Sequence, residues 1–242
     1  MKKLLLSFAV VVAVVAWASS HAVAQKVTNP GDPIVGIWQT AIGGNSTAST
    51  AGTANAGQYP AGEPPAQAID GRYLSPYGAT APQGSKYLNF GTGGGSGVSA
   101  ITKGVGTGYY VTPAIGPSIV TGIQIATAND APERDPLTVS IEGSNATGAD
   151  LALGSSWTVI QSSVNLGIDT NPGRFILAPI VTFANTTPYT SYRVLVQSQR
   201  ASANSTQYGE LNLFSAIPEP STIALAAAGL LGLVVAVRRR KS

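Results

Sequence analysis

The stretch "VTGIQIATANDAPERDPLTVSIEGSN", residues 120–145, decides the fold class. It holds two apolar runs rich in β-branched residues, separated by a polar loop with two prolines at residues 128–136. In the second run every other residue from Leu137 to Ile141 is apolar, which is the period of a half-buried strand. The stretch therefore predicts two strands joined by a polar connection.

The same pattern recurs along the chain. Between Gln39 and Ala66 the sequence is rich in Gly, Ala, Ser and Thr, and we expect a loop there. No amphipathic helix is evident, so the pattern predicts an all-β antiparallel β-sandwich, with a jelly roll as the preferred topology. Further strands are expected within Ser85–Gly91, Gly108–Gly116, Ser156–Ser163, Arg174–Ala184, Ser191–Gln199 and Tyr208–Ala216.

The first 24 residues have the features of a signal peptide. Two lysines precede an apolar run, and "AVA" at residues 22–24 is a small-residue cleavage site. We expect cleavage between Ala24 and Gln25, which exports the chain. The alternative is an uncleaved N-terminal anchor.

The C-terminal residues 217–242 form a second targeting segment. The apolar run Ser221–Val237 predicts a short transmembrane helix of about 25 Å. A basic tail follows at once, so the terminus is expected in the cytoplasm and the body, residues 25–216, outside. A plain C-terminal anchor is the simplest interpretation.

This segment also resembles the PEP-CTERM sorting signal of Gram-negative bacteria. The resemblance implies processing by an exosortase, transient residence in the inner membrane, and delivery to the cell surface or extracellular matrix. It is carried by Pro218, Glu219 and Pro220, the apolar run, and Arg238, Arg239 and Arg240.

Composition excludes several classes of function. The two terminal segments hold six of the 14 basic residues and one of the 11 acidic residues, so the body carries eight and ten, a net charge of about −2. This balance gives no support for nucleic-acid binding. The chain has no cysteine, and its one histidine, His21, lies in the signal peptide. Histidine- or cysteine-based catalytic triads and the usual zinc sites are therefore excluded.

The body resembles the discoidin-like, galactose-binding-like domain, known from F5/8 type C and family 32 carbohydrate-binding relatives. The resemblance implies an eight-stranded jelly-roll sandwich and carbohydrate binding. It is carried by the segments Ala66–Gly71, Gly84–Gly91, Val120–Asn145, Trp157–Ile160, Tyr192–Val196 and Gly209–Phe214, in that order.

The discoidin resemblance also implies a structural calcium ion. Asp70 matches the Asp of the family's Asp-Gly loop, Glu210 matches its late Glu, Gly209 offers a carbonyl, and Ser85 offers a hydroxyl. Oxygen donors of these kinds suit calcium. Arg72 and about ten extra residues after it depart from the family pattern. In the alternative, Asp70 caps a turn and Glu210 is an edge-strand charge.

The loop at residues 128–136 carries three carboxylates around Arg134. Two carboxylates are the minimum for glycoside hydrolysis, but these lie within six residues of each other and offer no second wall for a substrate. We therefore expect a loop stapled by Arg134, and no enzyme.

Four tyrosines in or beside expected loops are candidates for sugar contact: Tyr73, Tyr77, Tyr109 and Tyr110. In the alternative they cover the rim of the core. The sequence thus favours an exported, exosortase-sorted surface or matrix protein whose body binds exopolysaccharide. A structural envelope or biofilm matrix protein without a specific ligand is the alternative.

Overall fold

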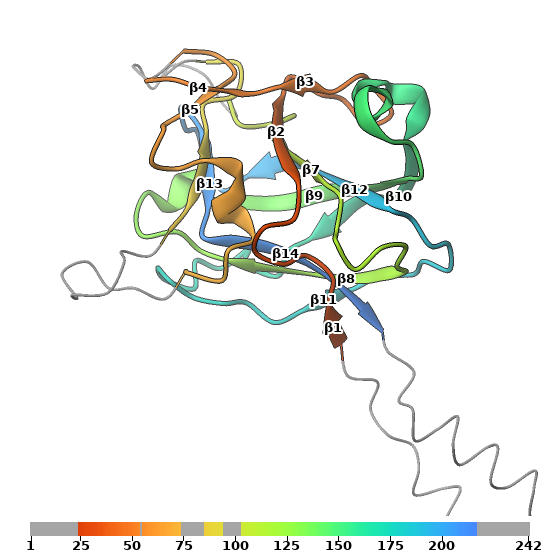
Figure 1. The fold of residues 1–242 in the computed structure, drawn as a ribbon. Helices are drawn as coiled ribbons and strands as arrows, with labels where there is room; N and C mark the ends of the chain where they lie inside the picture. Colours follow the sequence, from red (N-terminus) through yellow and green to blue (C-terminus); the bar gives the residue numbers. More distant parts are fainter. Residues whose placement is uncertain (1–23, 54, 74–84, 94–102, 217–242) are drawn as a thin grey trace, which may run out of the picture. The chain divides into compact units, whose positions relative to one another are not determined.

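The computed structural model describes residues 24–53, 55–73, 85–93 and 103–216, and these confirm the expected all-β class (Figure 1). No α-helix occurs in this part of the chain. The short 3-10 helices are η1 (Pro65–Ala68), η2 (Pro132–Arg134), η3 (Gly148–Ala152) and η4 (Gly154–Ser156). The strands are β1 (Ala24–Lys26), β2 (Ile34–Trp38), β3 (Thr47–Ala48), β4 (Thr50–Ala51), β5 (Gln58–Tyr59), β6 (Tyr87–Asn89), β7 (Gly108–Val111), β8 (Val120–Ala126), β9 (Pro136–Ser144), β10 (Thr158–Asn165), β11 (Val181–Thr182), β12 (Ser191–Gln199), β13 (Thr206–Tyr208) and β14 (Glu210–Ala216).

Two sheets make up the sandwich. One has four strands in the order β1-β14-β8-β11, and the other has six in the order β10-β9-β12-β7-β2-β3. The long ladders are antiparallel, as expected, whereas the small β4–β5 pair is parallel. The jelly-roll connectivity stays a prediction.

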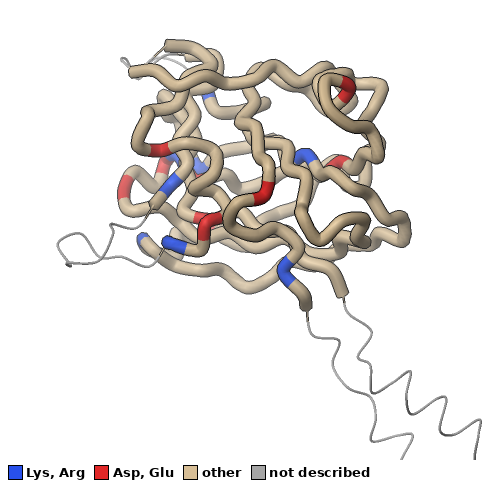
Figure 2. The backbone as a smooth tube through the Cα atoms, viewed as in Figure 1, with Lys and Arg blue, Asp and Glu red and all other residues tan. Residues whose placement is uncertain are grey.

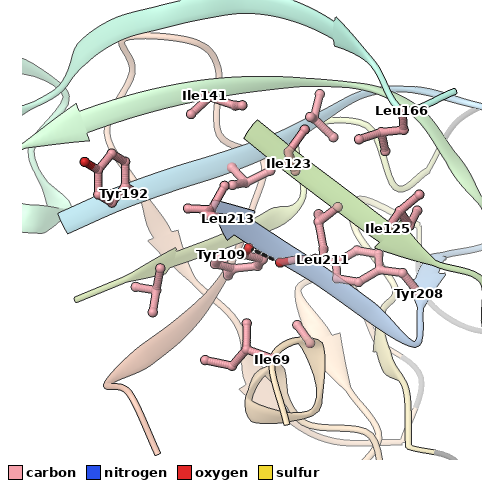
Figure 3. Close-up of a cluster of buried hydrophobic side chains, with 14 of the residues drawn as sticks. Ile69, Tyr109, Ile123, Ile125, Ile141, Leu166, Tyr192, Tyr208, Leu211 and Leu213 are labelled. Carbon is pink, nitrogen blue, oxygen red and sulfur yellow. Dashed lines mark hydrogen bonds between the residues drawn. The ribbon is translucent and has the colours of Figure 1, made fainter. Parts of the chain in front are cut away.

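The core lies between the two sheets, and both contribute to it (Figure 3). Ile123, Leu211 and Leu213 of the four-stranded sheet meet Tyr109 and Val194 of the six-stranded sheet, all at most 1% exposed. Burying one such aliphatic side chain contributes about 1.5–3 kcal/mol. Because residues Lys26–Ser215 form one compact unit around this core, the body is suited to study by itself.

The sequence pattern misplaced two strands. Within the expected strand at Arg174–Ala184 only Val181–Thr182 forms a strand, and Leu177 adds an isolated bridge to Ala126. The ladder is interrupted because Phe175 has a φ of 58° and Pro179 lacks an amide donor. Conversely, "IVGIW" at Ile34–Trp38 forms β2 and pairs with β7, although no strand was expected there.

The expected signal peptide, apart from Ala24, and the whole segment 217–242 with its expected transmembrane helix lie outside the described residues. Among the residues that are described, no helix is both long and apolar enough to cross a bilayer.

Candidate functional site

Three of the four residues expected to hold calcium meet at one end of the sandwich. Asp70 follows η1, and both of its carboxylate oxygens accept hydrogen bonds from the Ser85 hydroxyl at 2.8 Å. Its Oδ1 also accepts the Arg72 amide at 2.9 Å, which closes a turn over Asp70-Gly71. Asp70 therefore caps a turn, as the alternative interpretation expected, and also faces a second loop through Ser85.

Glu210 opens β14 at this same place and is fully buried. Its Oε1 accepts the backbone amides of Gly71 and Arg72, and its Oε2 accepts the Asn212 side chain at 2.7 Å. The Lys26 ammonium lies 3.9 Å from Oε2. The pKa of Glu210 is raised to about 7, mainly by burial and also by a hydrogen bond with the Asp70 carboxyl, against the opposing effects of Asn212 and Lys26.

The donor set fits a hard cation in kind. Two adjacent carboxyl groups and a hydroxyl are ligands that calcium prefers. The raised pKa of Glu210 indicates that the hydrogen bonds it accepts do not fully compensate its carboxylate for the loss of water. Within the described residues no group of three or more acidic, His or Cys side chains could hold a metal. Backbone or water oxygens would have to complete the shell. The backbone amide of Gly209 donates to the Ala126 carbonyl. Gly209 precedes Glu210 in the chain, so only its carbonyl oxygen could act as a ligand.

A second polar site, which we call the Lys86 cluster, adjoins the first. It consists of Glu63, Lys86, Asp130, Arg134 and Gln207. The Lys86 side chain is 10% exposed, and its ammonium donates to Asp130 Oδ1 at 2.9 Å and to Gln207 Oε1 at 3.1 Å, with Glu63 Oε1 at 3.6 Å. The Arg134 guanidinium donates to the same Gln207 oxygen at 3.3 Å. A buried ammonium thus holds two acidic side chains and an amide in fixed positions.

The groups of this cluster differ in exposure and in charge state. Burial raises the pKa of Glu63, and the nearby Lys86 only partly opposes this. Burial also opposes ionisation of Asp130, but hydrogen bonds from Lys86 and Gln207 outweigh it and hold the pKa of Asp130 below its usual value. The Asp130 side chain is 53% exposed, so it presents an ionised carboxylate to solvent.

Buried polar atoms without a hydrogen-bond partner are concentrated here. Among the described residues they include Glu63 Oε2, Asn129 Oδ1, Arg134 Nε and Arg174 Nε. Arg174 belongs to the same neighbourhood, because it donates to the Asp130 carbonyl. Such atoms are rare in folded proteins, and buried water is the usual partner for them.

The loop at residues 128–136 is stapled, but not by Arg134 as expected. Asp135 is buried and accepts a bidentate pair from Arg174 and a longer contact at 3.4 Å from Arg200. Both arginines come from distant segments, so proximity in sequence pointed to the wrong partner. Arg134 instead turns toward Gln207.

The four candidate tyrosines do not form one site. The expectation for Tyr109 is wrong: its ring lies in the core, and its hydroxyl donates to the Leu211 carbonyl (Figure 3). Tyr73 is half-buried, with its Cβ against Gly209. Tyr77 lies outside the described residues.

Tyr110 lies on the other face of β7 from Tyr109, because successive residues of a strand point to opposite faces. Its ring packs at 6.0 Å from Trp157, which is buried and also lies under the Arg193 guanidinium at 4.8 Å. Arg193 forms a fully buried ion pair with Glu142 at 2.6 Å. Tyr110 therefore belongs to a packed structural assembly, with only part of its ring left for contact.

Comparison with known proteins gives separate results for the C-terminal segment and for the body. Residues 216–241 match the model of the PEP-CTERM protein-sorting motif, which confirms the resemblance of this segment. A search of curated proteins found no match.

Solved structures similar to the chain are discoidin-like domains. The family 32 carbohydrate-binding module from Clostridium perfringens NanJ, solved with galactose, is 13% identical over 67% of this chain and 93% of its own, with a TM-score of 0.42. An F5/8 type C domain from Bacteroides fragilis is 12% identical over 64% and 83%, with a TM-score of 0.44. The family 32 module of Streptococcus pneumoniae EndoD is 10% identical over 79% and 99%, with a TM-score of 0.45.

Proposed function

We propose that this chain is an exported, non-enzymatic surface or matrix protein whose β-sandwich binds a polysaccharide at the Lys86 cluster. The PEP-CTERM motif at residues 216–241 supports export, a stage held in the inner membrane by the C-terminal apolar segment, and processing by an exosortase. The observation that carries the binding proposal is the exposed Asp130 carboxylate, which hydrogen bonds from Lys86 and Gln207 hold in place.

The chemistry of the cluster suits sugar hydroxyl groups. A hydroxyl donates one hydrogen bond and accepts others, so a pair of neighbouring hydroxyls is satisfied by a carboxylate beside a cationic donor. Asp130 supplies the carboxylate and Arg134 the guanidinium, while Lys86 and Gln207 hold them from beneath. Lys86 has its hydrogen bonds committed to protein groups and acts as a positioning residue.

Binding of an exopolysaccharide panel by the body, measured by affinity electrophoresis and calorimetry, tests this proposal. We expect Asp130→Asn and Arg134→Gln each to weaken binding about 10- to 100-fold, the range of one charged hydrogen bond. Glu133→Gln is the matched control, because Glu133 lies in the same loop and its side chain makes no hydrogen bond to the described residues. Equal binding by all variants would refute the Lys86 cluster as the glycan site, and no binding to any glycan would favour the purely structural matrix protein.

We also propose that Asp70, Ser85 and Glu210 hold a structural calcium ion. The ion would neutralise the two adjoining carboxyl groups and tie the loop after η1 to β14. The Ser85 hydroxyl and the Lys86 ammonium sit on consecutive residues, so the metal would also steady the Lys86 cluster. The melting temperature of the body should rise with calcium concentration, and Asp70→Ala should abolish the rise.

A further inference from the structure

The body has one end from which the chain continues into the sorting segment. Ser215, near the end of β14, lies opposite Val120 at the start of β8. The loops at this end are residues 27–33, 112–119, 145–147 and 183–190. They are held together by bonds from Thr112 to Pro33, from Tyr189 to Ser118 and from Thr190 to Asn145. We call this the exit end.

The exit end is almost free of charge. Its four loops contain one charged side chain, Asp32, which is 6% exposed and accepts the amides of Asn29 and Ala114. The charged side chains gather instead elsewhere on the body, as the coloured tube shows (Figure 2). The loops at the opposite end carry Asp130, Glu133, Arg134, Asp135, Asp169, Arg174 and Arg200.

Two large apolar side chains project from the exit end. Ile115 and Ile119 are 48% and 38% exposed, on a loop that contains no charged residue. The loop is well fixed, because Gly116 closes a turn on Pro113 and Ser118 forms a bridge with Tyr189. An isolated exposed isoleucine needs no explanation, but two on an uncharged end of the molecule indicate a contact surface.

The length of chain beyond the body identifies the partner. Only five residues separate Ser215 from Ser221, where the apolar run begins. Even fully extended, that connection spans about 20 Å. While the apolar segment is in the membrane, the exit end is therefore held within this distance of the bilayer surface.

We propose that the exit end is a lipid-contacting surface, with Ile115 and Ile119 inserted into the headgroup region of the membrane that holds the uncut chain. This inference rests on the membrane stage of the proposed function. Shallow burial of apolar side chains at the headgroup boundary is one way in which peripheral segments bind bilayers. The contact would orient the opposite end, with the Lys86 cluster, away from the membrane.

Single-cysteine labelling tests this, because the natural chain contains no cysteine. The full chain would be reconstituted into phosphatidylethanolamine–phosphatidylglycerol vesicles with a doxyl-labelled lipid as quencher. Ile115→Cys and Ile119→Cys carry the fluorophore NBD at the exit end. Ala201→Cys is the matched control, because Ala201 is exposed in a loop at the opposite end. Ala227→Cys, within the apolar run, reports insertion of that segment.

We expect NBD at positions 115, 119 and 227 to emit at shorter wavelength and to lose emission to the lipid quencher, with no change at position 201. Quenching at 227 alone would overturn the lipid contact and leave the membrane stage intact. If 227 is not quenched, the membrane stage itself fails, and the inference fails with it. Neither result affects glycan binding at the Lys86 cluster, which the body assay measures independently.

Discussion

The buried carboxyl of Glu210 makes the stability of the body depend on pH in a direction opposite to that of most paired acids. Its pKa is raised from 4.5 to about 7 in the folded state. The native state therefore holds this proton more tightly than the unfolded chain does. The stabilisation is complete below pH 4.5 and is lost as the pH rises through about 7. At 1.36 kcal/mol per unit, the loss is about 3 kcal/mol.

Replacing Glu210 with Gln should remove this pH dependence. The amide keeps the shape of the protonated acid, and its oxygen still accepts the amides of Gly71 and Arg72. In EDTA at pH 8 we expect Glu210→Gln to be more stable than the natural chain by about 3 kcal/mol, or about 6–12 °C in melting temperature. At pH 4.5 the two should melt together.

Urea unfolding of the body between pH 4.5 and 8, in EDTA, is the assay. Glu133→Gln serves as the control, because it removes a carboxyl group from the loop at residues 128–136 and leaves Glu210 unchanged. A stability difference between the natural chain and Glu210→Gln that does not change with pH would refute the reasoning. Added calcium at pH 8 should stabilise the natural chain and leave Glu210→Gln unchanged if the proposed metal site exists.

Two further substitutions test the account of the fold. Arg193→Met should destabilise the body by about 3–5 kcal/mol in urea unfolding, because it leaves the buried Glu142 without its partner; Arg193→Met with Glu142→Leu should recover much of that loss. Tyr109→Phe should cost about 1 kcal/mol, for the lost bond to the Leu211 carbonyl, with glycan binding unchanged; altered binding would contradict the placement of Tyr109 in the core.

Local patterning predicted the strands that pair over long ladders. The alternation in Leu137–Ser144 and Ser191–Gln199 matches β9 and β12 closely, because both strands have one face against the core. It was only partly right for Arg174–Ala184, where the positive φ of Phe175 and the missing amide of Pro179 leave only the short strand β11 and one isolated bridge. The pattern also could not predict which of Tyr109 and Tyr110 is buried. Tyr109 lies in the core and Tyr110 on the opposite face of β7, a difference set by strand register.

Of the two polar sites, one was predicted from the sequence and the other was missed. The family resemblance brought Asp70, Ser85 and Glu210 together correctly in space, although whether calcium binds them stays a prediction. The Lys86 cluster was missed, because Glu63 and Gln207 come from segments without a motif. Lys86 itself offered a signal: it is one of only eight basic residues in the body and directly follows Ser85.

The two ends of the sandwich impose different requirements on one small domain. Charged side chains need water or partners, so they are excluded from an end that contacts lipid and are useful at an end that contacts sugar hydroxyls. The strand β14 links the two, since it begins at Glu210 beside the charged loops and ends at Ala216 where the sorting motif starts. Removal of the sorting segment after Ala216 would leave this strand whole. The body would then keep its fold and the proposed glycan site while losing the proposed connection of its exit end to the membrane.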